Sequence, residues 1–500
     1  MTMSANRRWA MLVTVGAGLL LITLDNSILY TALPTLVEEL GASSSESLWI
    51  INAYPVVMAG LLLGAGTLGD RIGHRKMFLI GLVVFGLASV LAAFSPNPEV
   101  LIGARAALAV GAATMMPATL ALIRVTFEVE RERNIAVAIW GSLALVGSAL
   151  GPIISGLLLQ SFWWGSVFLI NVPVVVLAFV ATLVLAPHVD PDPSKKWDLV
   201  SSAYALITLV GLVIAIKEVA KDPSVIVLVA LAASALGGVL FVRRQRRLPY
   251  PLLEFSIFRN PAFSAGVLAA GFAMFAIAGV QLITTQRFQL VEGFTPLEAG
   301  FLVAAVALGS LPMALVGGAL LWRVGLLPII AGGLALSVVG AIVVTLSFDS
   351  SMVLLTVGLV VLGAGVGAAM SVASSAIIGN VPASRAGMAS SVEEVSYEFG
   401  SLTAVALLGS LVTAVYTAAI TVPAGVSKAA SESLDNALAI ARENGDTGGL
   451  VANANEAFDT GYLVVMVVVV AVLAAGTAVT GWLLRDHGPK NAAADAAVSH

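Results

Sequence analysis

Cysteine is absent from this chain of 500 residues, and charged residues are scarce. Without cysteine, neither disulfide bonds nor thiol chemistry can contribute to structure or activity. Charged residues make up only 11 % of the sequence, too few to cover the surface of a water-soluble protein of this length. The four histidines are scattered through predicted loops and the tail, and no GxxxxGK[ST] sequence occurs. We therefore expect no enzyme, no metal site, no cofactor and no direct use of ATP.

Long hydrophobic runs dominate the chain instead. Apolar residues supply 59 % of the sequence, and the mean hydropathy is +1.00. A membrane-spanning helix needs about 20 apolar residues, and the sequence offers about fourteen such runs. Because lipid provides no hydrogen-bond partners, each run is expected to be a helix. They lie near residues 10–33, 48–68, 77–94, 100–123, 135–160, 164–186, 199–217, 223–242, 263–288, 299–321, 326–346, 351–378, 387–416 and 458–484.

The positive charges predict the orientation of these helices. With the N-terminus inside, the inner links carry 19 of the 25 lysines and arginines. The outer links and their flanks carry five, including Arg287, and Arg105 is left inside a span. Because inner loops of membrane proteins are enriched in positive charge, this bias supports both the helix count and an N-in, C-in topology. The predicted fold class is an all-α polytopic membrane protein with 14 transmembrane helices.

Two proline- and charge-rich links, at 187–198 and 243–262, flank a pair of hydrophobic helices. This pattern predicts six helices, two inserted helices and six more. LLEFSIF in the second link either lies flat on the inner membrane surface or forms a plain tether. The predicted domains are an N-terminal bundle at 1–186, an inserted pair with its links at 187–262, a C-terminal bundle at 263–484 and a cytoplasmic tail at 485–500.

A long outer loop is predicted between residues 417 and 457. Leu434, Leu438 and Ala441 recur there at helical spacing. The loop is therefore either a short helical cap over the outer mouth or a solvated segment.

Residues 66–76, GTLGDRIGHRK, join two of the hydrophobic runs. Glycines allow a tight reversal where two helices leave the membrane, and the charges between them mark a cytoplasmic turn. The segment resembles the signature loop of the major facilitator superfamily of transporters. We expect it to control conformational change through contacts at the inner helix ends, and not to bind substrate. The residues concerned are Gly66, Asp70, Arg71, Gly73 and Arg75.

The fifth span contains the sequence GSALGPIISG. Its small residues allow close helix approach, and proline bends a helix. The sequence resembles the antiporter motif of drug-exporting major facilitators, which adds Gly147, Gly151, Pro152 and Gly156 to the expected gating residues. Ordinary helix packing is the alternative interpretation.

Other segments resemble the fourteen-helix drug:proton antiporter family within that superfamily. They are LDNSILYTALP (24–34), LWIINAYPVVMAG (48–60), FLINVP (168–173) and VEEVSYEFG (392–400). The last resembles the acidic motif of quaternary-ammonium efflux pumps of the QacA, SmvA and LfrA group. Some relatives carry an acid where this chain has Asn52, and another near Ser310, where this chain has none. We therefore expect weaker binding of doubly charged than of singly charged cations.

The resemblance implies a major facilitator fold in the cell membrane, with two six-helix bundles that rock about a central site. It implies export of hydrophobic, mainly cationic compounds, such as quaternary ammonium compounds, dyes like ethidium and antibiotics. Export would be driven by inward proton flow. Protons, drugs and membrane lipids would be the partners of a monomer that binds no nucleic acid. An exporter of an endogenous lipid or amphipathic metabolite is the alternative.

Charges inside the predicted spans are the strongest site candidates, because burying a charge in lipid is costly. Asp25 and Arg105 are expected to approach each other, either as a proton-carrying carboxylate tuned by arginine or as a structural ion pair. Glu393, Glu394 and Glu398 fall within two turns of one helix, so we expect them to share or exchange a proton that a cationic substrate displaces. Glu394 leads this group, and Glu398 could instead orient its neighbour.

Weaker candidates for the substrate cavity combine aromatic and amide side chains. Aromatic faces attract organic cations, although such stripes also serve as packing surfaces. The candidates are Asn26, Tyr30, Asn52, Phe275, Gln281, Thr285, Phe288, Gln289 and Tyr397.

Overall fold

The structure is a computed structural model that describes residues 4–187, 198–219, 225–249, 251–381 and 386–485. Within these residues the chain forms sixteen α-helices. Twelve are long and apolar enough to cross a membrane, which fits the expected all-α polytopic membrane protein. Two further long helices, α2 and α5, lie among them but are not in that set. The predicted link at 187–198 and the tail fall almost wholly outside the described residues.

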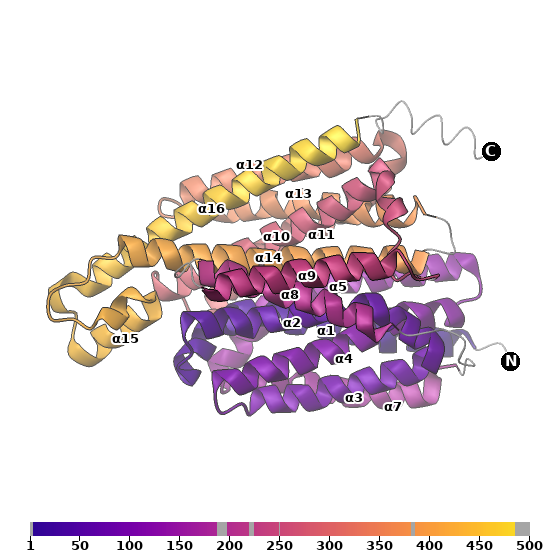
Figure 1. The fold of residues 1–500 in the computed structure, drawn as a ribbon, viewed down its shortest axis with the longest axis horizontal. Helices are drawn as coiled ribbons and strands as arrows, with labels where there is room; N and C mark the ends of the chain where they lie inside the picture. The colour runs from indigo at the N-terminus through magenta and orange to yellow at the C-terminus, as the bar shows by residue number, and fades with distance from the viewer. Residues whose placement is uncertain (1–3, 188–197, 220–224, 250, 382–385, 486–500) are drawn as a thin grey trace.

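The N-terminal helices pack into one bundle, seen in indigo to violet in Figure 1. Its main helix pairs are α3 with α4, α1 with α5 and α2 with α4. Ser43 begins α2 with a capping box, because its hydroxyl accepts the amide of Glu46 while the Glu46 carboxylate accepts the amide of Ser43. The helices are α1 (Ala5–Leu40), α2 (Ser44–Ile72), α3 (His74–Ala93), α4 (Pro98–Thr126), α5 (Glu130–Ser161), α6 (Ser166–Leu169) and α7 (Asn171–Leu185).

The C-terminal helices form a second bundle, which repeats the helix cap and the glycine turn of the first. Thr295 and Glu298 repeat the capping box at the start of α11. Gly73 and Gly325 both adopt positive φ, at 93° and 79°, in the turns that lead into α3 and α12. The helices are α10 (Pro261–Leu290), α11 (Pro296–Val324), α12 (Leu326–Ser347), α13 (Met352–Ile378), α14 (Ala386–Ala419), α15 (Leu434–Asn444) and α16 (Leu450–Leu483).

The inserted helices α8 (Leu199–Val219) and α9 (Val225–Gln245) pack on each other, and α8 packs on α2 and α14. They therefore cover one side of the junction between the bundles. In the following link, η1 (Phe255–Arg259) is a short 3₁₀ helix rather than a plain tether. Ile257 is buried against residues of α10, α13 and α14, so this part of the link packs on protein.

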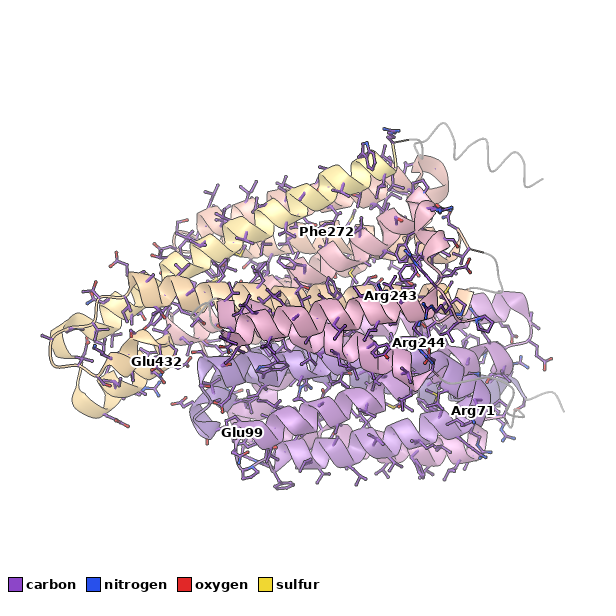
Figure 2. All side chains as sticks on the ribbon, viewed as in Figure 1. Arg71, Glu99, Arg243, Arg244, Phe272 and Glu432 are labelled. Carbon is purple, nitrogen blue, oxygen red and sulfur yellow. The ribbon has the colours of Figure 1, made fainter. Side chains whose placement is uncertain are left out.

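The two bundles meet through α5 against α11 and α2 against α14. Both described ends of the chain lie at the right of Figure 1, whereas α15 lies at the far left. We call these the inner end and the outer end of the molecule. In Figure 2, Arg71, Arg243 and Arg244 lie toward the inner end and Glu432 lies at the outer end.

The long loop after α14 contains ordered helix. The helical interpretation is confirmed, because α15 forms and buries Leu434 at 2 % exposed. Short 3₁₀ turns, η3 (Lys428–Ser431) and η4 (Thr447–Gly449), flank it. The predicted bounds of the loop were too wide, since α14 runs to Ala419 and α16 already begins at Leu450.

Candidate functional site

A buried ion pair joins α1 and α4. Nη1 of Arg105 donates to the Asp25 carboxylate, and the two side chains are 0 % and 1 % exposed. Asn171 in α7 donates through Nδ2 to Oδ1 of Asp25 at 2.8 Å. The Nε of Arg105 donates to the carbonyl of Ile50 at 3.2 Å. The expected approach of Asp25 and Arg105 is therefore confirmed, whereas their part in proton transfer stays a prediction.

The Arg105 guanidinium has several partners, but one of its nitrogens makes no hydrogen bond within the described residues. It lies over the ring of Tyr54, 4.7 Å from the centroid. Its Nη2 has no hydrogen-bond partner among the described residues. A buried charge that loses its partner costs several kcal/mol. The protonation state of any carboxylate near this guanidinium therefore affects the whole cluster strongly.

Two of the three acids on α14 differ in how they are held. Glu393 is 7 % exposed and accepts hydrogen bonds from Tyr397 at 2.8 Å and from Ser374 of α13 at 3.2 Å. Its two carboxylate oxygens are thus engaged within the C-terminal bundle. Glu394, the next residue, is partly exposed, and no side-chain hydrogen bond engages it within the described residues. Glu394 is consequently freer to exchange a proton or to bind a cation.

Glu398 of α14 lies within electrostatic range of Arg105 and of Tyr30, which belong to the N-terminal bundle. Its Oε2 is buried without a partner among the described residues, as is Nη2 of Arg105. A carboxylate and a guanidinium from opposite bundles thus each keep one polar atom without a partner among the described residues, although no hydrogen bond joins them there.

Hydrogen bonds cross between the bundles close to these groups. The Tyr30 hydroxyl lies 3.0 Å from the Ser401 hydroxyl of α14. Gln289 of α10 donates to the carbonyl of Thr31 at 3.0 Å. Near this junction, Asn52 is 0 % exposed, yet neither amide atom has a partner among the described residues. Buried amides are rarely left unpaired, so water or a ligand is expected to reach them.

The other proposed cavity residues are also mostly buried. Oδ1 of Asn26 and Oγ1 of Thr285 lack partners in the described part of the chain. Gln281 and Phe275 are each 5 % exposed. Phe288 packs on Phe294, with ring centroids 5.1 Å apart, near the outer end. Substrate contact by these residues stays a prediction.

The glycines of α5 permit close helix approach. A Cβ on Gly151 would lie 1.8 Å from the Ser27 hydroxyl of α1, and one on Gly147 would lie 2.0 Å from the Thr23 hydroxyl. On Gly156 it would meet the backbone of Leu297 in α11 at 2.3 Å. The motif, bent around the buried Pro152, therefore packs on α1 beside Asp25 and on the opposite bundle.

The inner turn connects to its own bundle. Gly73 ends α2 with a positive φ, and Gly66 lies within α2 with open space around it. The Arg75 guanidinium donates to the carbonyl of Leu183 in α7 at 2.7 Å, and Arg71 is exposed. The side chain of Asp70 lies outside the described residues. Conformational control by this turn stays a prediction.

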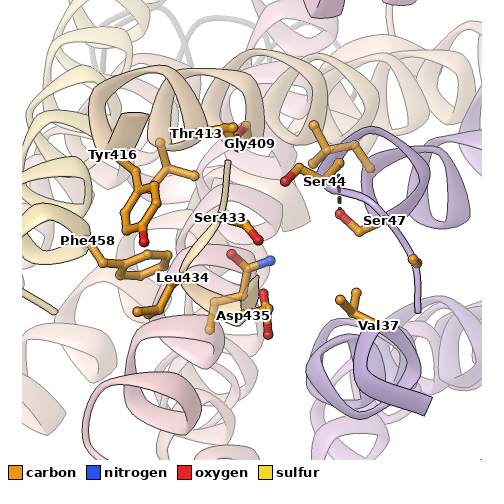
Figure 3. A pocket seen from close by; sticks show the side chains of 14 residues that line it. Val37, Ser44, Ser47, Gly409, Thr413, Tyr416, Ser433, Leu434, Asp435 and Phe458 are labelled. Carbon is orange, nitrogen blue, oxygen red and sulfur yellow. Dashed lines mark hydrogen bonds between the residues drawn. The ribbon is translucent and has the colours of Figure 1, made fainter. Parts of the chain in front are cut away.

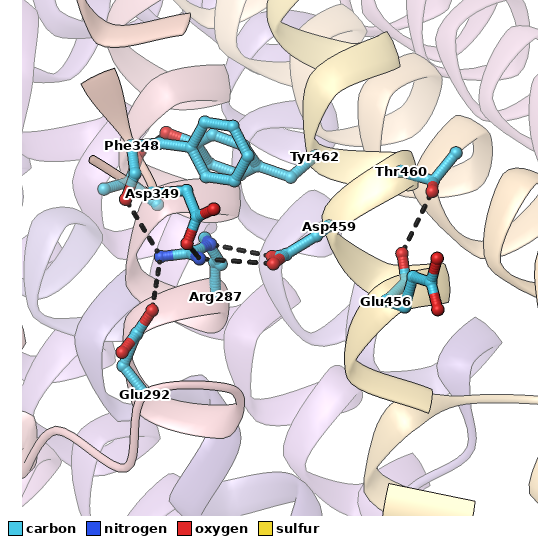
Figure 4. A network of polar contacts seen from close by, with 9 residues as sticks. Arg287, Glu292, Phe348, Asp349, Glu456, Asp459, Thr460 and Tyr462 are labelled. Carbon is cyan, nitrogen blue, oxygen red and sulfur yellow. Dashed lines mark hydrogen bonds and ion pairs between the residues drawn. The ribbon is translucent and has the colours of Figure 1, made fainter. Parts of the chain in front are cut away.

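A second buried arginine, which the charge count placed with the outer links and their flanks, lies in the last turn of α10. Arg287 falls within the predicted span 263–288 and is 1 % exposed. Its guanidinium contacts Asp459 of α16 at 2.8 Å, Glu292 at 3.0 Å and Asp349 at 3.9 Å, as Figure 4 shows. The sequence did not predict these partners, because Asp459 and Asp349 are distant from Arg287 in the chain.

Sequence reasoning also missed side chains that complete the Asp25 cluster. Asn171 belongs to the quoted FLINVP segment, and Tyr54 belongs to LWIINAYPVVMAG, so both segments were noticed, but neither of these two side chains was predicted to join the Asp25 cluster. In the described part of the chain, no three His, Asp or Glu side chains gather as a metal site.

Known proteins share both the sequence and the fold. A model of the Major Facilitator Superfamily matches residues 15–289, and one for sugar and other transporters matches residues 260–429. The chain is 36 % identical over 497 residues to the multidrug efflux pump LfrA of Mycolicibacterium smegmatis, covering 97 % of this chain and 98 % of that relative. It is 36 % identical over 451 residues to the methyl viologen resistance protein SmvA of Salmonella typhimurium, covering 89 % and 91 %.

Among solved structures, the fold is similar to that of a bacterial homolog of the human lysosomal transporter Spinster, in an inward-facing and unoccupied conformation. The TM-score is 0.69 at 16 % sequence identity, and the match covers 97 % of this chain and 99 % of that chain. At this identity the likeness concerns the fold.

Proposed function

The chain belongs to the Major Facilitator Superfamily, and from that premise we propose that it is a proton-coupled antiporter that exports hydrophobic, mainly cationic compounds. It is a multi-pass membrane transporter and not an enzyme. The names of relatives at 36 % identity, a multidrug efflux pump and a methyl viologen resistance protein, support drugs as the cargo.

The observation that supports proton coupling is a carboxylate and a guanidinium from opposite bundles that influence each other electrostatically. Glu398 and Arg105 come from opposite bundles, lie within electrostatic range, and each has a polar atom without a partner among the described residues. A proton or an organic cation that neutralises the acids of α14 changes their attraction to Arg105. Binding of a proton or cation at the acids of α14 is thereby linked to the relative position of the two bundles.

The topology we propose has fourteen spans, with both termini on the inner side. α2 and α5 are 29 and 32 residues long and pack among the twelve apolar spans, which supports counting them. An even count brings both termini to one side, which agrees with their place in Figure 1. The proposed domains are bundles at 1–186 and 263–484, joined by the inserted pair at 187–262.

Transport would proceed by alternating access about the midplane. Here the outer halves of the bundles touch, through Tyr30 and Ser401, Gln289 and Thr31, and Gly156 and Leu297. The conformation is thus closed on the outer side. We propose that cargo enters from the inner side and that these contacts separate when it leaves.

The test is ethidium efflux from proteoliposomes under an imposed proton gradient. Wild type should export ethidium only with the gradient, and Glu394→Gln should lose at least about 90 % of that rate because it cannot release a proton. Glu443→Gln, which removes an exposed acid from α15, is the matched control and should keep the rate.

Two results would contradict parts of the proposal. No export by folded wild type would reject drug export and favour an endogenous lipid or metabolite as cargo. Undiminished export by Glu394→Gln would leave drug export in place but would assign the coupling proton to Asp25 or Glu393 instead of Glu394.

A further inference from the structure

A cavity of about 50 Å³ lies at the outer end, under α15 and between the two bundles. Figure 3 shows Val37 and Ser47 of the N-terminal bundle on one side of it. Tyr416, Asp435 and Phe458 line the other side. We call it the outer cavity. It is separate from the acids of α14 and from the Asp25–Arg105 pair.

The lining combines one carboxylate with hydroxyl and amide side chains, among them Ser47 and Gln286, and with aromatic and aliphatic side chains. Tyr416 donates its hydroxyl to the carbonyl of Ala430 at 2.9 Å, which fixes the orientation of its ring. Phe458 and Leu434 contribute apolar surface beside it. Rings attract ammonium groups, and this is strongest where water is partly excluded. A carboxylate beside two rings is therefore suited to a hydrophobic cation.

The Asp435 carboxylate lies in the first turn of α15 and interacts with its own backbone amide, but no side chain donates a hydrogen bond to it within the described residues. Arg442 on the same helix lies within electrostatic range of it and forms an ion pair with Glu38 of α1. Since Glu38 neutralises Arg442, the charge of Asp435 remains available.

The loop that carries α15 is tied to the N-terminal bundle beside the cavity. Arg442 of α15 pairs with Glu38, and the Ser44 hydroxyl donates to the carbonyl of Glu432, just before α15, at 3.4 Å. Under the proposed function, both contacts bridge the junction that opens when cargo leaves toward the outer side, which would place the outer cavity on the exit route.

We propose that the outer cavity binds the quaternary ammonium group of an exported cation during its release, with Asp435 as the counter-charge and Tyr416 and Phe458 flanking the cation. The identity of the cargo rests on the proposed function. With a volume of about 50 Å³, the space is far too small for a whole dye, so the proposed occupant is the ammonium group alone.

Protons at the outer side would compete with the cation. Burial, with a smaller contribution from Glu38, raises the pKa of Asp435 to about 6, while its own backbone amide and Arg442 oppose the rise. Tyr416 also lines the cavity beside this carboxyl group. The cation binds while Asp435 is ionised, so binding is full above about pH 7 and is lost as pH falls through about 6. Acid outside thus favours release.

Binding of tetramethylammonium tests the site directly. The full-length protein in nanodiscs is titrated at pH 7.5, and the bound fraction is followed by saturation-transfer NMR. We expect Asp435→Asn to weaken binding by about tenfold, and lowering the pH of wild type to 5 to do the same. Glu432→Gln is the matched control, because it removes an exposed acid of the same loop that does not line the cavity.

A further variant, Phe458→Leu, keeps the test decisive if Asp435→Asn does not fold, and it should weaken binding by about threefold. Equal affinity in wild type and in the cavity variants would overturn the proposal. So would loss of binding in Glu394→Gln alone, which would assign the cation to the central site.

The binding measurement does not depend on transport. Efflux of ethidium by wild type, measured separately, tests the proposed function. If binding depends on Asp435 but the protein exports no ethidium, the proposed site stands and the proposed drug export is wrong. If the protein exports ethidium but shows no such binding, the proposed drug export stands and the proposed site is wrong.

Discussion

Among the described residues each bundle buries one arginine, but the carboxylates around the two arginines differ in exposure. The partner of Arg105 is Asp25, which is 1 % exposed and lies deep within α1. The partners of Arg287 are 27 %, 40 % and 78 % exposed, and two of them, Glu292 and Asp349, lie just beyond helix ends. Three rings, including that of Phe348 at 4.7 Å, surround the Arg287 guanidinium.

From this difference we infer that the Arg105 cluster responds to protonation, whereas Arg287 mainly stabilises the fold. When any one of its three carboxylate partners is neutralised, Arg287 keeps the other two, so this change should have little effect. Arg105 has one buried carboxylate and one nitrogen without a partner among the described residues, with Glu398 within range. Neutralising one acid there changes the balance for the whole cluster.

The largest expected difference comes from removing one carboxylate in each bundle. Asp25→Asn leaves Arg105 buried without its ion-pair partner, at a cost of about 3–5 kcal/mol, and should reduce gradient-driven ethidium efflux by at least about 100-fold. Asp459→Asn leaves Arg287 with Glu292 and Asp349 and should change efflux by less than about threefold. Efflux rates are compared for equal amounts of inserted protein.

A double variant controls for simple loss of folding. Asp25→Asn combined with Arg105→Met removes both buried charges and should recover much of the melting temperature without recovering efflux. Equal losses of efflux from Asp25→Asn and Asp459→Asn would remove the distinction between the two arginines.

An intermediate effect is expected from Arg287 itself. Arg287→Met loses three ring contacts and the bonds to α16, so it should lower stability by about 2 kcal/mol. Efflux per folded molecule should stay within about twofold of wild type. Thermal unfolding in detergent and efflux at equal folded amounts measure the two effects. An intact melting temperature with lost efflux would give Arg287 a role in transport.

The sequence was sufficient for the helices and for one arginine pair, because membrane physics restricts both. Hydrophobic runs must form helices in lipid, because only a helix satisfies its own backbone hydrogen bonds. Asp25 and Arg105 both lie inside predicted spans, away from water, so each was expected to need a partner of opposite charge. The repeated capping boxes at Ser43 and Thr295 were also readable, as S-x-x-E and T-x-x-E before hydrophobic runs.

What could not be predicted depends on partners distant in sequence. The burial of Arg287 could not be predicted because its partner Asp459 is 172 residues away. The electrostatic influence of Arg105 on Glu398 and the bond between Tyr30 and Ser401 likewise depend on how the bundles pack. The outer cavity depends on where α15 docks, which helical spacing alone does not specify.

The smallest expected effect comes from a third arginine pair, which lies at the surface. Asp198, just before α8, accepts from Arg244 of α9 at 2.9 Å and from the amide of Ser201 at 3.2 Å. Partial burial raises the pKa of Asp198, but the bonds from Arg244 and Ser201 outweigh it and hold the pKa below its usual value. The stability this pair contributes is therefore complete at neutral pH and is lost only as pH falls below about 4.

Because the Arg244 side chain is 37 % exposed, Asp198→Asn should cost less than about 1 kcal/mol and leave efflux unchanged. Hydrogen exchange at the first turn of α8 measures the cost, which should be constant from pH 8 to 5 and shrink below about pH 4. If Asp198→Asn lowers stability as much as Asp25→Asn does, then the solvent exposure of the partners does not determine how much an arginine pair contributes to stability in this protein. The inserted helices would then have to be counted with the transport machinery.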